Sequence, residues 1–190
     1  KKMLDSAMVL QSAGEDSRLA APVSGSIATI IANGEYISYL KENNKDVNAR
    51  WGVSSLPAFE PGGKTSAFGG DIHIMISEGT KYEKASKEFM KFLITSKENM
   101  TRGILEKGVI PVNTEAYLEP QLDKKLGMFE NQRVIRLFIE SARESPEAYS
   151  GANYPELRKL IREAQARIFI NNESISEVMK ELERNSKLKY

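Results

Sequence analysis

Residues 80–108 read TKYEKASKEFMKFLITSKENMTRGILEKG, and this stretch decides how the chain is expected to fold. Thr80 and Glu83 have the spacing of a capping box, in which a hydroxyl and a carboxylate satisfy free amides at a helix start. Apolar side chains then recur on one helical face, at Tyr82, Ala85, Phe89, Phe92 and Leu93. A second helix is predicted over 96–107, and Gly108 suits the left-handed cap that ends it.

The segments on either side of this stretch complete the predicted domain. Short runs rich in β-branched or alternating apolar residues predict three strands, over residues 26–31, 51–56 and 71–77. Helical spacing returns near 115–124, 127–143, 157–168 and 175–182. Early strands separated by helices, followed by a helical run, predict an α/β domain with a helix-rich C-terminal half.

The composition is that of an ordinary soluble globular protein. Lysine and arginine number 27 and acidic residues 26, for a formal net charge of +1, so we expect no nucleic-acid partner. The chain has no cysteine, which excludes disulfides and thiolate metal sites. Its apolar runs are far shorter than the ~20 residues that span a bilayer, so no transmembrane segment is expected.

The residue types needed for catalysis or metal binding are scarce. His73 is the only histidine and lies in a predicted strand, where neither a metal cluster nor a Ser-His-Asp set can be built on it. Glu35 and Asp71 are the carboxylates that a glycosidase interpretation would use. Both lie beside glycine turns, and we interpret them as polar ligand-binding groups. The prediction is a protein without enzymatic activity, catalytic residues, metal or cofactor.

Six segments in a fixed order carry a resemblance to a known family. They are SGSIATIIANGEY at 24–36, WGVSSLP at 51–57, FGGDIHI at 68–74, KASKEFMKFL at 84–93, GVIPVN at 108–113 and the closing segment 171–182. Their order resembles family 1 of the bacterial extracellular solute-binding proteins, the sugar-binding components of ABC importers with a maltose-binding-protein-like layout. The sequence departs from the family pattern at Ser26, at Tyr36 in place of a tryptophan, and at Asn171–Asn172 in place of a glycine.

The resemblance implies the C-terminal lobe of a two-lobed periplasmic-binding-protein type II fold. Residues 1–70 and 117–190 would form this lobe, and residues 71–116 would cross to the N-terminal lobe and return. No signal peptide opens the sequence, and we expect a fragment that lacks the rest of the N-terminal lobe. The helix that carries Phe89 and Phe92 is therefore expected to expose an apolar face.

The resemblance also implies a function, namely capture of a small solute outside the cytoplasm. A sugar or oligosaccharide is the expected ligand, and the membrane subunits of an ABC importer are the expected partners. The protein would act in the periplasm, or as a lipoprotein at the outer face of the cytoplasmic membrane. A carbohydrate-sensing or interaction module and a glycan-processing enzyme are the alternatives, and a polyamine or glycerol phosphate remains open as ligand.

Tyr36 matches the family's sugar-stacking tryptophan and is the first expected ligand-binding residue. Its alternative is an ordinary core tyrosine. The other expected ligand-binding residues are Gly34, Glu35, Trp51, Gly69, Gly70, Asp71, Asn153 and Tyr154. The alternatives are a core position for Trp51, a plain strand entry for the glycine pair, and a helix cap for Asn153.

Overall fold

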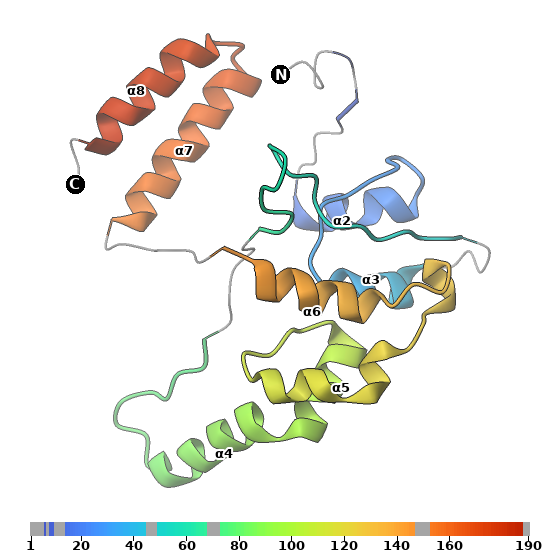
Figure 1. The fold of residues 1–190 in the computed structure, drawn as a ribbon. Coiled ribbons are helices and arrows are strands. Elements are labelled where there is room, and N and C mark those ends of the chain that lie inside the picture. The colour runs from blue at the N-terminus through green and yellow to red at the C-terminus, as the bar shows by residue number, and fades with distance from the viewer. Residues whose placement is uncertain are drawn as a thin grey trace. The chain divides into compact units, whose positions relative to one another are not determined.

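The computed structural model describes residues 6, 8–9, 14–44, 49–67, 73–146 and 153–187. The chain forms two compact units, Ser12–Glu147 as the larger and Ala148–Tyr190 with Lys1–Gln11 as the smaller. The larger unit contains α2 (Glu15–Val23), α3 (Tyr36–Asn43), α4 (Glu83–Thr95), α5 (Lys97–Lys107) and α6 (Val134–Glu144). Three 3₁₀ turns connect α5 to α6: η1 (Thr114–Leu118), η2 (Pro120–Asp123) and η3 (Gly127–Phe129). The smaller unit contains α7 (Tyr154–Phe169) and α8 (Ile175–Lys187) (Figure 1).

The two helices predicted from residues 80–108 are confirmed as α4 and α5. The capping box predicted at Thr80 and Glu83 is not formed, because the N-cap of α4 is Tyr82 and no side chain caps this end. The Thr80 hydroxyl instead accepts the Tyr82 amide at 3.3 Å. The hydroxyl of Ser96 accepts a hydrogen bond from the Asn99 amide at 3.3 Å and caps the start of α5. Gly108 ends α5 in the left-handed conformation, with a φ of 68°. The local sequence signals therefore fix both ends of α5.

The expected strands are not found in the part of the chain that the structure describes. Residues 26–31 and 51–56 have no strand assignment, and neither do residues 73–77. Residues 71 and 72, which begin the third expected strand, lie outside the described residues. Within the described residues, the β-type pairing is one isolated antiparallel bridge, between Leu126 and Gln132. The helix-rich character is confirmed, and the lobe assignment and the type II fold stay predictions.

A side chain takes the place that a neighbouring strand would occupy beside residues 51–53. The Val53 amide donates to Oε1 of Gln132 at 2.9 Å, and Nε2 of Gln132 donates to the Val53 carbonyl at 3.1 Å. The Trp51 amide donates to the Met128 carbonyl at 2.9 Å. A β-rich segment becomes a strand only where another backbone pairs with it, and here a side-chain amide satisfies the same groups.

The core of the larger unit is built from α3, α5, α6 and the three 3₁₀ turns. Its largest fully buried side chains are Ile104, Leu122, Phe129, Val134 and Ile139. The buried residues of α6 lie at helical spacing, so one face of this helix is directed into the core; they are Val134, Ile135 and Ile139. Figure 1 shows α5 lying between α3 and α4, so α4 forms the outer edge of this unit.

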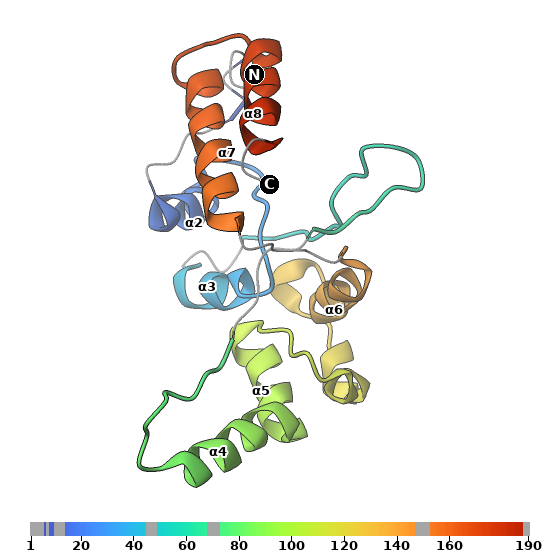
Figure 2. The same ribbon diagram turned by 90° about the vertical axis from the view of Figure 1, so that its left-hand side faces the viewer.

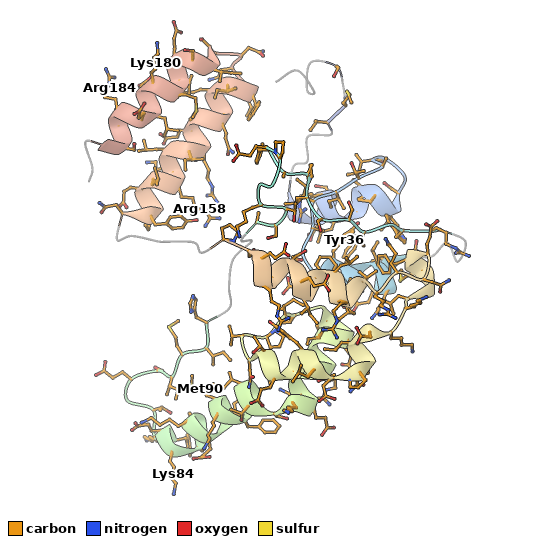
Figure 3. All side chains as sticks on the ribbon, in the orientation of Figure 1. Tyr36, Lys84, Met90, Arg158, Lys180 and Arg184 are labelled. Atoms are coloured by element: carbon orange, nitrogen blue, oxygen red, sulfur yellow. The ribbon has the colours of Figure 1, made fainter. Side chains whose placement is uncertain are left out.

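The expected exposed apolar face is confirmed on α4. Phe89 is 61 % exposed and Phe92 is 54 % exposed, and none of the residues of α4 is buried. Lys84 and Met90 on the same helix are labelled in Figure 3. A solvent-exposed helix ordinarily presents polar side chains on its outer face, so this face is unusually apolar.

An arginine ties α6 to the 3₁₀ turns before it. Nε of Arg136 donates to the Asp123 carboxylate at 2.8 Å, and its Nη1 donates to the Tyr117 carbonyl at 3.0 Å. The hydrogen bond from Arg136 lowers the pKa of Asp123 below its ordinary value.

Because its folded-state pKa is lowered, Asp123 contributes stability that is present above the unfolded pKa of about 3.9 and is lost as the pH falls through the folded value. The free energy of unfolding of Asp123→Asn is therefore expected to fall less steeply between about pH 5 and pH 2 than that of the wild type. Urea unfolding across this range measures the two slopes. Parallel pH profiles for the two proteins would contradict the expectation.

The smaller unit is a helical hairpin in which α7 and α8 lie side by side (Figure 2). Ala164, Ile168 and Val178 are buried between the helices. Arg167 donates to both Glu173 and Glu181 at 2.8 Å, which ties the connection and α8 to the end of α7. The hairpin turns at Asn172 with a φ of 59°, which confirms that this asparagine accepts the left-handed conformation. None of the helices in the described segments is long and apolar enough to cross a membrane.

Candidate functional site

Three of the expected ligand-binding residues lie in one turn at residues 33–36, whose last residue, Tyr36, is the first residue of α3. Nδ2 of Asn33 donates to the Glu35 carboxylate at 3.2 Å, and the Tyr36 amide donates to the Asn33 carbonyl at 3.2 Å. Asn33 and Glu35 are exposed, whereas Gly34 and Tyr36 are buried. The turn therefore presents an amide and a carboxylate to solvent while its other two residues are buried.

Tyr36 lies among the core side chains (Figure 3) and is 7 % exposed. Its hydroxyl donates to the Leu19 carbonyl at 2.9 Å, and its ring stacks on that of Tyr39 with centroids 5.5 Å apart. Burial and the neighbouring Tyr39 raise the pKa of Tyr36, and Arg18 partly opposes this. The structure thus gives Tyr36 the core position noted as its alternative, and its stacking on a solute stays a prediction.

Gly34 is held against the end of α5. A Cβ at Gly34 would overlap the Gly108 carbonyl oxygen and lie 3.3 Å from the carbonyl carbon. This close approach of two backbones gives a structural reason for glycine at position 34.

The remaining expected residues of the larger unit are placed less completely. Trp51 is half-buried and packs against the core, and its indole Nε1 is buried without a hydrogen-bond partner. Gly69, Gly70 and Asp71 lie outside the described residues. The structure therefore gives no distance between Asp71 and Glu35, the pair that a glycosidase interpretation needs.

Asn153 and Tyr154 belong to the smaller unit, where they begin α7. Asn153 occupies the N-cap position of its alternative interpretation, but its side chain makes no capping hydrogen bond to α7. Tyr154 is 45 % exposed. The expected site residues are thus distributed over both compact units, and the turn at 33–36 is the part that the structure assembles.

Three residues around this turn were not identified from the sequence. Nη1 of Arg18, on α2, donates to the Ile31 carbonyl at 2.9 Å, next to the turn. Tyr39 supplies the second ring of the aromatic stack, and Gly108 contacts Gly34. The three-residue spacing of Tyr36 and Tyr39 on a helix could have predicted their contact, whereas no local signal relates Gly108 to Gly34.

The described residues contain no cluster of three or more histidine, cysteine, aspartate or glutamate side chains able to hold a metal ion. At the turn, an amide and a carboxylate are available for hydrogen bonding, next to an aromatic pair. In proteins, such groups form hydrogen bonds to polar small molecules without a covalent step.

A comparison with family models matches residues 1–130 to one described as bacterial extracellular solute-binding protein. No curated protein matches the chain. The matched range contains the turn at 33–36, α2 to α5 and all three 3₁₀ turns. The family comprises proteins that bind solutes outside the cytoplasm for transport and that are typically not enzymes. The match covers more than half of the chain, which therefore belongs to the family of bacterial extracellular solute-binding proteins.

Proposed function

We propose that this protein captures a sugar or oligosaccharide and delivers it to the membrane subunits of an ABC importer. The observation that carries the proposal is the family match over residues 1–130, because an extracellular solute-binding protein has solute capture as its task. The location proposed for it is the periplasm or the outer face of the cytoplasmic membrane. Residues 71–116 would cross to a second lobe, by the resemblance described above.

The turn at residues 33–36 is the proposed centre of the solute site. An amide and a carboxylate held 3.2 Å apart in the exposed Asn33–Glu35 pair offer both donors and acceptors to the hydroxyl groups of a sugar. The aromatic pair of Tyr36 and Tyr39 follows directly on α3. Sugar rings combine hydroxyl groups with apolar C–H faces, so a site with polar and aromatic groups suits them.

The other expected residues enter the proposal as further contributors to the site. They are Trp51, Gly69, Gly70, Asp71, Asn153 and Tyr154. A two-lobed binding protein closes around its solute, so the second lobe would complete such a site.

The proposal is tested by ligand-induced thermal shift on the full chain. The probes are glucose, maltose and maltotriose, with spermidine and glycerol 3-phosphate as non-sugar comparisons. A sugar that binds is expected to raise the melting temperature saturably. Glu35→Ala is expected to raise the sugar concentration that gives half of the maximal shift by about tenfold or more, because a charged hydrogen-bonding partner is lost. Tyr36→Ala is unsuitable here, since it would also remove a core side chain.

Glu60→Ala is the matched control, because Glu60 is also an exposed glutamate of the larger unit and lies outside the proposed site. It should respond as the wild type does. Equal responses in Glu35→Ala and Glu60→Ala would place the solute elsewhere. A response to spermidine or glycerol 3-phosphate alone would replace the sugar by a charged solute.

A further inference from the structure

The backbones of two distant segments cross in direct contact beside the turn at residues 33–36. A Cβ added at Gly108 would overlap the Gly34 carbonyl group and lie 2.9 Å from the Glu35 amide nitrogen. A Cβ added at Gly34 would in turn overlap the Gly108 carbonyl oxygen. Both glycines are buried. No side chain separates the two backbones, so the position of one fixes the position of the other.

Side chains link the same two elements further along. Nζ of Lys41, on α3, donates to the Leu105 carbonyl of α5 at 2.8 Å. Lys107 and Glu42 form an ion pair at 3.5 Å, in which both side chains are 64 % exposed. An ion pair this exposed holds two elements together only weakly. The buried backbone crossing therefore constrains the end of α5 and the start of α3 more closely than this ion pair does.

We propose that Gly108 is a positioning residue for the solute-binding turn. The carbonyl of Gly34 accepts the Ile37 amide at 3.0 Å, and that bond belongs to the first turn of α3. Gly108 lies against this carbonyl and against the Glu35 amide, so it sets where the Glu35 side chain emerges. Gly108 acts through the turn and contacts no solute itself. The inference rests on the proposed function.

Glycine is required at position 108 for two independent reasons. First, residues other than glycine rarely adopt a φ of 68°, the value at this position. Second, the added Cβ would overlap backbone atoms, which do not move aside as a flexible side chain would. Gly108→Ala is thus expected to displace the Gly34 carbonyl and loosen the turn, and with it the placement of Glu35.

Amide hydrogen exchange measured by NMR on the full chain tests the positioning directly. Gly108→Ala is expected to speed exchange of the Tyr36, Ile37 and Ser38 amides at least tenfold more than that of the α6 amides. Leu122→Ala is the control, because it removes a fully buried side chain of the same unit on η2. It should affect α6 at least as strongly as the turn. A uniform increase across both regions in Gly108→Ala would overturn the inference, since it indicates only global destabilisation.

Affinity for solute supplies the second measurement, with glucose, maltose and maltotriose as probes. Gly108→Ala is expected to bind at least tenfold more weakly than Leu122→Ala, measured at a temperature where both are folded. Unchanged affinity in Gly108→Ala would overturn the positioning role. A wild type that binds none of the probes, nor spermidine or glycerol 3-phosphate, would overturn the proposed function and the solute role of Gly108 together. The exchange result would then describe a structural coupling alone.

Discussion

Gly34→Ala is expected to lower the free energy of unfolding of the larger unit by about 3 kcal/mol. At most positions that tolerate a side chain, replacing glycine by alanine stabilises a protein by about 0.4–1 kcal/mol, because the unfolded chain loses freedom. At Gly34 the sign reverses, since the new Cβ would overlap the Gly108 carbonyl oxygen. Relief requires α3 and the end of α5 to move apart, which disturbs the packing of Ile37 and Ile104.

Gly103→Ala is the matched control for this substitution. Gly103 lies within α5, and a Cβ there would meet nothing within 4 Å outside its own helix turn. Alanine is the better helix former by about 1 kcal/mol, so this variant should be as stable as the wild type or more stable. Trp51 is the only tryptophan and lies in the larger unit, so its fluorescence during urea unfolding reports on this unit. Similar midpoints for the two alanine variants would contradict the predicted role of the crossing.

The predictability of this fold divides between local and non-local signals. The cap at Gly108 and the apolar periodicity after Tyr82 were sufficient to place α4 and α5, because helix ends and faces depend on neighbouring residues. Even the exposed face of α4 was expected, although from the resemblance and not from the residues alone. These elements need no knowledge of what packs against them.

The strands could not be predicted in the same way. Val53 lies in a segment whose residues favour an extended backbone, but the structure assigns no strand there. The local sequence does not show which group will hydrogen-bond to this backbone. Here it is the side chain of Gln132, 79 positions further along the chain. A ladder requires two backbones, and local propensity describes only one of them.

The candidate site shows the same division. The sequence placed Glu35 beside a glycine turn, and the structure has that turn at residues 33–36. It could not distinguish a buried Tyr36 from an exposed one, because a tyrosine serves either role and burial depends on α2, whose Leu19 carbonyl accepts the hydroxyl. The ligand roles of the site residues remain predictions for the experiments above.

Phe129→Ala is expected to cost about 3–5 kcal/mol, the range for removing a large aromatic side chain from a packed core. Phe129 is 1 % exposed and is the largest fully buried side chain of the larger unit. It lies in a short irregular turn held by backbone hydrogen bonds from Phe129 to Leu126 and from Gln132 to Phe129. So short a turn has little stability of its own, and the buried ring is what anchors it.

Phe59→Ala makes the same chemical change at a fully exposed position of the same unit and should alter stability by less than about 0.5 kcal/mol. The difference between the two variants in urea unfolding, followed by Trp51 fluorescence, isolates the burial of the ring from the loss of an aromatic residue. Because Met128 accepts the Trp51 amide and Gln132 holds Val53, loss of the ring should also loosen the segment at 51–53. Phe129→Ala is therefore expected to shift the native Trp51 emission, whereas Phe59→Ala should leave it unchanged. Equal stability of the two variants would mean that the turn between η2 and α6 is not anchored by Phe129, and the core assigned to the larger unit would have to be revised.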